Sequence, residues 1–134
     1  MNAFIVELPN KPGELARITE SIAQKGIDIT SFSGATCGDS GSVALLTNDE
    51  AGTRSTIQAA GFRVREIEVV PASLENRPGT LAEAARRLAD AGVNIEAALP
   101  TGMSGNNVTV AFATSDPAKA RQALGEKVLT GMSG

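Results

Sequence analysis

The chain has 134 residues, of which 42% are hydrophobic and 20% are charged, the balance of a folded globular protein rather than a disordered one. Its 12 basic and 15 acidic residues give a net charge of −3, and it contains no Trp and no Tyr. A basic stripe with stacking aromatic residues is therefore missing, so nucleic-acid binding is not expected.

The residue types that bind metals and form disulfides are scarce. Histidine is absent and Cys37 is the only cysteine, which excludes an internal disulfide and a metal site of the usual nitrogen and sulfur type. Residues 1–8 lack the features of a signal peptide, and no stretch approaches the roughly 20 apolar residues of a membrane span. We expect a cytoplasmic protein with no metal, cofactor or membrane contact.

The chain contains an internal repeat. Residues 8–29 align without a gap to residues 74–95, and nine of these 22 positions are identical. After one extra residue in the second copy, residues 43–47 align with residues 110–114. Since the offset is about half the chain length, the repeat indicates a duplicated domain. We expect one domain over residues 1–66 and another over residues 67–134.

In chain order, the first copy opens with a strand over about residues 2–8, which ends before Pro12-Gly13. The next segment predicts a helix that ends at Gly26, because apolar residues recur every three or four positions. Those residues are Leu15, Ile18 and Ile22. Strands over about 27–34 and 42–47 follow, then a helix starting near residues 48–50 and a strand over 62–66.

The second copy repeats this order. Strands are expected over about residues 67–75, 93–99 and 107–114, and the helix between the first two carries Leu81, Ala85 and Leu88 on one face and ends at Gly92. A second helix begins at residues 115–117, where an N-cap is followed by Pro. This copy is shorter at its end and leaves only residues 127–129 for a fourth strand.

The order β-α-β-β-α-β, present twice, predicts an α+β fold of two ferredoxin-like units. Each would hold an antiparallel sheet with its helices on one face. A unit of about 66 residues buries little surface by itself. We therefore expect the two copies to pack together and a second chain to cover the remaining sheet edges, which gives a homodimer.

The strand-to-helix turns carry the chemistry. They read Asn10-Lys-Pro-Gly-Glu-Leu15 and Asn76-Arg-Pro-Gly-Thr-Leu81. The first N–H groups of each following helix have no partner within the helix and lie at the positive end of its dipole, which suits a carboxylate. Asp28 and Asn94 begin the next strands and can accept hydrogen bonds from an ammonium group. A free amino acid presents both of these groups.

The pattern N-[KR]-P-G-x-L-A, about a dozen helical residues and then G-[IV]-[DN]-I resembles the ACT domain, a regulatory module that binds amino acids. The second copy is similar to the serine-sensing domain of bacterial phosphoglycerate dehydrogenases. In that family a histidine and two asparagines hold the ligand. The asparagine positions correspond to Asn76 and Asn94 here, whereas Leu74 stands at the histidine position, and Leu8 and Asp28 depart from the pattern in the first copy.

The resemblance implies that ligands lie at the turns, at the interface between paired domains. The expected ligand-binding residues are Asn10, Pro12, Gly13, Glu14, Leu15, Asp28, Ile29, Asn76, Pro78, Gly79, Thr80, Leu81, Asn94 and Ile95. The loss of the histidine leaves a more apolar wall, which favours an apolar ligand side chain. The expected protein is a regulator and not an enzyme, because the chain has no histidine and no nucleophile paired with a base.

Other interpretations stay open at this stage. Asn before Pro is common turn chemistry without any ligand, and Asp28 and Asn94 could serve only the local backbone. The protein could be an interaction module that dimerises or docks on a metabolic enzyme through a sheet edge. Cys37 is most simply an ordinary thiol, because no histidine is present to activate it.

Overall fold

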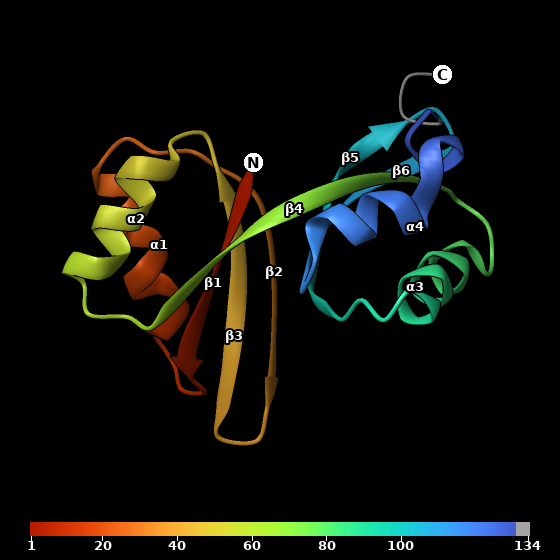
Figure 1. Ribbon diagram of the computed structural model, residues 1–134. Helices are drawn as coiled ribbons and strands as arrows, with labels where there is room; N and C mark the ends of the chain where they lie inside the picture. Colours follow the sequence, from red (N-terminus) through yellow and green to blue (C-terminus); the bar gives the residue numbers. More distant parts are fainter. Residues whose placement is uncertain (131–134) are drawn as a thin grey trace. The chain divides into compact units, whose positions relative to one another are not determined.

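The computed structural model describes residues 1–130, with the side chains of residues 1–125. The chain divides into two units (Figure 1). The first unit consists of Asn2–Ile67, and the second consists of Glu68–Gly134 together with Met1.

The first unit contains three complete strands, two helices and the beginning of a fourth strand. They are β1 (Asn2–Pro9), α1 (Glu14–Gln24), β2 (Ile29–Cys37), β3 (Ser40–Thr47), α2 (Glu50–Ala59) and the first residues of β4 (Val64–Glu75). The strands lie in the order β2-β3-β1-β4, and β3 is antiparallel to both β1 and β2. The amide of Glu7 on β1 donates to the carbonyl of Arg63, the residue just before β4, at 3.1 Å.

The second unit contains the rest of β4, then α3 (Thr80–Asp90), β5 (Ile95–Ser104), β6 (Asn107–Thr114) and α4 (Pro117–Thr130). Its strands lie in the order β4-β6-β5, and β6 is antiparallel to both neighbours. The α+β fold of two ferredoxin-like units is thus confirmed.

Two details of the predicted strands are wrong. The strands expected over 62–66 and 67–75 form one continuous strand, β4, because no turn residue separates Glu66 from Glu68. The short strand expected over residues 127–129 is not formed, since these residues lie within α4, whose backbone leaves helical geometry only at Gly125. Among the described residues the second unit therefore lacks the strand that completes the first.

Each unit has its own aliphatic core between its helices and one face of its strands. The first core contains Phe4, Val6, Leu8, Ile18, Ile22, Ile27, Val43, Leu45 and Ile57. The second core contains Val70, Ala72, Leu74, Ala84, Leu88, Val93, Val110, Phe112, Ala120 and Leu124. Alternate residues of β1 and β4 supply each core, as expected for strands with one face against helices.

The first helix of each unit buries a narrower face than its sequence pattern predicts. Ile18 and Ile22 are buried on α1, but Leu15 is 49% exposed. On α3 the buried residues are Ala84 and Leu88, whereas Leu81 is 58% exposed. Helical spacing alone cannot separate these cases, because it gives the face on which a residue lies but not whether another element covers that face.

The predicted ends of α1 and α3 and the predicted starts of α2 and α4 are confirmed. Gly26 and Gly92 follow α1 and α3 with φ of 71° and 74°, the left-handed conformation that ends helices. At the start of α2 the carboxylate of Asp49 accepts from the amide of Gly52 at 2.9 Å, and at the start of α4 Asp116 accepts from Lys119 at 3.1 Å. Within residues 1–130, no helix is long and apolar enough to cross a membrane.

Candidate functional site

The two Pro-Gly turns place a glycine directly before each helix. Gly13 and Gly79 have φ of 90° and 92°, and neither helix start has a side chain that accepts from its first amides. This differs from α2, where Asp49 caps the helix. The turns and their prolines are exposed. The first amides of α1 and α3 are thus left for solvent or a ligand at the positive end of the helix dipole.

The two turn asparagines have different surroundings. The side-chain amide of Asn10 donates to the carbonyl of Gly38 in the β2–β3 hairpin, at 2.8 Å, and its backbone amide donates to Asp39. The backbone amide of Asn76 makes the equivalent bond to Asn106, at 2.8 Å. Within the described part of the chain, however, the Asn76 side chain has no bonding partner. The Asn10 side chain therefore links its turn to the β2–β3 hairpin, whereas the side-chain amide of Asn76 is available to a ligand.

A depression of about 410 Å³ lies beside the first turn. The residues that line it include Leu8, Asn10, Lys11, Glu14, Leu15 and Phe32. The carboxylate of Glu14 lies 3.1 Å from the Arg17 guanidinium and 3.9 Å from the Lys11 ammonium, so its charge at the helix start is balanced by two cations. The residues that line the depression thus provide a side-chain amide, balanced charges and apolar side chains.

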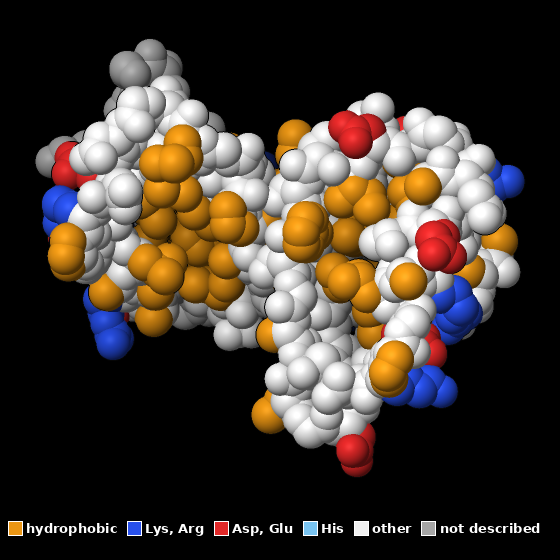
Figure 2. Space-filling view, turned by 180° about the vertical axis from the view of Figure 1, so that it is seen from behind, with side chains coloured by type: hydrophobic (Ala, Val, Ile, Leu, Met, Phe, Trp, Pro, Cys, Tyr) orange, Lys and Arg blue, Asp and Glu red, His pale blue; other side chains and the backbone are white. Residues whose placement is uncertain are grey.

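A second, more apolar depression of about 410 Å³ lies between α1 and β2. It is lined by Leu15, Ala16, Thr19, Ile29, Phe32 and Leu45. Leu15 and Phe32 line both depressions, and Phe32 is 67% exposed. Figure 2 shows hydrophobic side chains gathered on one face of each unit. Phe32 was not among the predicted site residues, because its exposure is decided by its place on an edge strand.

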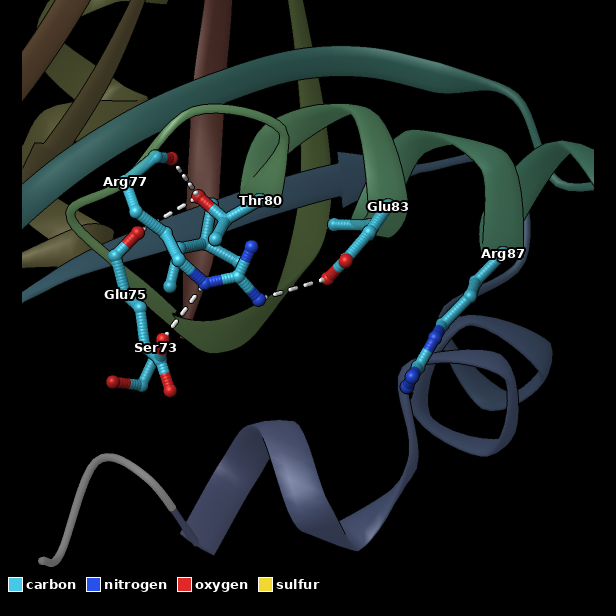
Figure 3. A pocket seen from close by; sticks show the side chains of 8 residues that line it. Ser73, Glu75, Arg77, Thr80, Glu83 and Arg87 are labelled. Carbon is cyan, nitrogen blue, oxygen red and sulfur yellow. Dashed lines mark hydrogen bonds and ion pairs between the residues drawn. The ribbon is translucent and has the colours of Figure 1, made fainter.

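The second turn borders a pocket of about 320 Å³ between the end of β4 and α3 (Figure 3). Arg77 lies between two carboxylates, 2.8 Å from that of Glu75 and 3.7 Å from that of Glu83. Its hydrogen bond to Glu75 and the charge of Glu83 raise the pKa of Arg77. The hydroxyl of Thr80 donates to the carbonyl of Glu75 at 2.8 Å, so Thr80 stabilises the turn.

Asp28 and Asn94 lie at the opposite end of the first helix from the turn of their own unit. Each is exposed, and their backbone amides donate to Asn48 at 2.9 Å and to Ser115 at 3.0 Å. The 11 residues of α1 span roughly 16 Å, which separates Asp28 from Asn10. Within one unit the predicted partners of a carboxylate and of an ammonium are therefore not brought together.

The remaining predicted residues follow the same division. Ile29 and Ile95 are partly buried at the starts of β2 and β5, next to Asp28 and Asn94. Leu8 and Leu74, at the family's histidine position, are buried in the two cores, with 8% and 9% exposure. The described residues contain no group of three or more acidic, cysteine or histidine side chains placed to hold a metal.

Comparison with known proteins places this geometry in a family. The model for the ACT domain pair matches residues 2–132. Among solved structures, protein BT0572 from Bacteroides thetaiotaomicron superposes with a TM-score of 0.74 at 28% identity, covering 94% of this chain and 87% of that one. No curated protein matches in sequence.

Regulatory proteins share the fold. The regulatory subunit of aspartate kinase from Thermus thermophilus, in its ligand-free form, has a TM-score of 0.64 at 16% identity and covers 92% of this chain and 88% of its own. The structure of aspartokinase alpha and beta subunits superposes with a TM-score of 0.66 at 22% identity, and the match covers 96% of this chain and 93% of that one. No catalytic family is indicated, and the match over nearly the whole chain shows that this protein belongs to the family of ACT domain pairs.

Proposed function

We propose that this chain is a regulatory protein that binds a small molecule, an amino acid, at its Pro-Gly turns. The observation that carries the proposal is the pair of uncapped helix starts at Gly13 and Gly79, the first of them beside a depression of about 410 Å³. Amides at a helix start suit a carboxylate, and the volume is within the range of small-molecule sites.

The apolar wall supports a ligand with an apolar side chain. Leu15 and Phe32 are both exposed and line the same depression, so a bound aliphatic group would remove their surface from water. The ammonium group of the ligand would then be received by the Asp28 or Asn94 side chain of a different ACT domain, because the two ends of the first helix are too far apart within one unit. The ligand accordingly lies between two domains, of one chain or of two, and favours the assembled state.

The first test is a thermal-shift screen of the full chain against the twenty common amino acids. A ligand at 100 times its Kd stabilises the folded state by about 2.7 kcal/mol, which raises Tm by several degrees. The site variant is Phe32→Ser, and the matched control is Met103→Ser, which also replaces an exposed apolar residue on a β-strand, 65% exposed.

We expect an apolar amino acid to raise the Tm of the wild-type chain and of Met103→Ser by more than that of Phe32→Ser, because Phe32 lines the depression at the first turn only. Two results would contradict the proposal. One is that no amino acid moves the Tm, and the other is that Phe32→Ser responds as the wild-type chain does.

A second candidate function is favoured by the same exposed surface. Leu15 on α1 and Phe32 on the edge strand β2 are exposed apolar residues that suit contact with a partner protein, such as a metabolic enzyme, without any ligand. In that case the screen gives no thermal shift, while Phe32→Ser still weakens binding to the partner.

A further inference from the structure

The floor of the depression at the first turn lies on the sheet, and two glycines form part of it. Gly34 of β2 and Gly41 of β3 both line this depression of about 410 Å³. Gly34 lies opposite Val43, and Gly41 lies opposite Leu8. Val43 and Leu8 belong to the first core, and residues directly opposite on antiparallel strands share a face of the sheet. Both glycines therefore lie on the face that packs against the helices.

The hairpin requires a glycine at position 41, but the sheet does not require one at position 34. At Gly41 an added Cβ would lie only 2.5 Å from the carbonyl oxygen of Ala35. At Gly34 the backbone is not in the left-handed region, and an added Cβ would meet Ser42 and Val43 at 3.4 and 3.6 Å, which is ordinary contact. Glycine inside a strand weakens it and often marks a close approach by another group. The packing of the unit thus does not account for Gly34, whereas a ligand in the depression does.

The second unit carries side chains at both of these positions. The strand register places Pro100 of β5 at the position of Gly34, and Val108 of β6 at the position of Gly41. Val108 is partly buried and packs against the second core. In the second unit the corresponding part of the sheet is therefore covered by side chains of the protein itself.

The apolar wall beside the glycines also differs between the units. In the first unit Phe32 and Leu15 line the depression, and both are exposed. The strand register places Ala98 at the position of Phe32 in the second unit, where it packs against the core. An aliphatic side chain above Gly34 would contact Phe32 and Leu15 and remove their surface from water. The first unit alone combines this wall with an open floor.

We propose that Gly34 and Gly41 determine the specificity of the ligand site. They leave space over the sheet for the aliphatic side chain of an amino acid whose carboxylate lies at the Gly13 turn. The first unit accordingly binds amino acids with branched aliphatic side chains, such as valine and leucine, and the second unit does not, so that one such ligand binds per chain. This inference rests on the proposed function, because it requires an amino acid to bind at the first turn.

The test is calorimetric titration of the full chain with L-alanine, L-valine and L-leucine, for the wild-type chain, Gly34→Val and Ser33→Val. Gly34→Val fills the space over the sheet, whereas Ser33→Val adds the same side chain to the opposite face of the same strand. We expect valine or leucine to bind the wild-type chain and Ser33→Val with similar affinity. Gly34→Val should bind leucine at least about tenfold more weakly, and its loss for alanine should be smaller, because a single methyl group does not reach the added side chain.

A second measurement uses the wild-type chain, so that a folding defect in the variant cannot decide the result. With bound leucine, nuclear Overhauser contacts should join the leucine methyl groups to the α-protons of Gly34 and Gly41.

The outcomes separate this inference from the proposed function. If none of the twenty amino acids binds, the proposed function fails and this inference fails with it. If amino acids bind but valine and leucine do not, only the specificity assignment is overturned. The same holds if Gly34→Val binds leucine as the wild-type chain does, if it loses alanine and leucine equally, if two ligands bind per chain, or if the methyl contacts appear at Pro100 and Val108 instead.

Discussion

The hydroxyl of Thr47 lies 2.7 Å from the hydroxyl of Thr53 at the junction of β3 and α2. The corresponding residues of the second unit, 67 positions later, are Thr114 and Ala120. Because the second unit has alanine in place of Thr53, the Thr114 hydroxyl is buried with no hydrogen-bond partner among the described residues.

Replacing Thr47 and Thr114 by valine should have different effects on stability. Thr114→Val removes an unpaired buried hydroxyl and should leave the free energy of unfolding unchanged or raise it by up to about 1 kcal/mol. Thr47→Val removes a formed hydrogen bond and should lower it by about 1 kcal/mol. Urea unfolding of each variant measures both, and a Thr114→Val variant less stable than Thr47→Val would contradict the assignment.

The turn asparagines should also differ in their structural role. Asn10→Ala removes the bond to the Gly38 carbonyl, and we expect it to lower the free energy of unfolding by about 1 kcal/mol and to speed amide exchange in the β2–β3 hairpin. Asn76→Ala should stay within about 0.5 kcal/mol of the wild-type chain. Asn76→Ala is therefore the cleaner variant for ligand measurements, and equal losses of stability in the two variants would show that the Asn10 bond contributes nothing.

The turn glycines should not tolerate a side chain. At Gly79, φ of 92° is a conformation that L-residues rarely adopt, although an added Cβ would meet no atom within 4 Å. Gly79→Ala should therefore cost about 1–2 kcal/mol through backbone strain alone. The control is Gly34→Ala on β2, where the nearest atom would be 3.4 Å away and φ is not in the left-handed region. Equal unfolding free energies for the two variants would contradict this prediction.

Acid should weaken the first unit through Glu66. Its carboxylate accepts from Arg54 Nε and Nη2, both at 2.7 Å, and from the Asn2 side chain at 2.7 Å. The hydrogen bonds from Arg54 and Asn2 lower the pKa of Glu66 from 4.5 to about 2. Since the folded-state pKa is the lower one, this contribution is complete above pH 4.5 and disappears as pH falls toward 2.

The measurement is the pH dependence of unfolding by urea between pH 5 and pH 2. The stability of Glu66→Gln should decline less over this range than that of the wild-type chain. Glu68→Gln should decline as the wild-type chain does, because the ion pair of Glu68 with Arg121 is about half exposed to solvent. An identical pH slope in the wild-type chain and Glu66→Gln would show that the pair is broken in solution. The effect is small, since the pair is partly exposed and screened by solvent.

The amino-acid sequence alone determined the duplicated α+β architecture, the ends of α1 and α3 and the starts of all four helices, because these depend on local signals. The Pro-Gly turns start the first helices and Gly26 and Gly92 end them, while Asp49 and Asp116 start the second helices. Each of these signals acts within one turn of the backbone, so it can be recognised without the tertiary structure.

Only the tertiary structure decided the parts that depend on neighbours distant in sequence. It joined residues 64–75 into one strand, which lies between β1 and β6. It also exposed Leu15 and Phe32 at the first turn and separated Asp28 from Asn10 by the length of α1. Periodicity gives the face of a helix or strand, but whether another element covers that face is decided by packing.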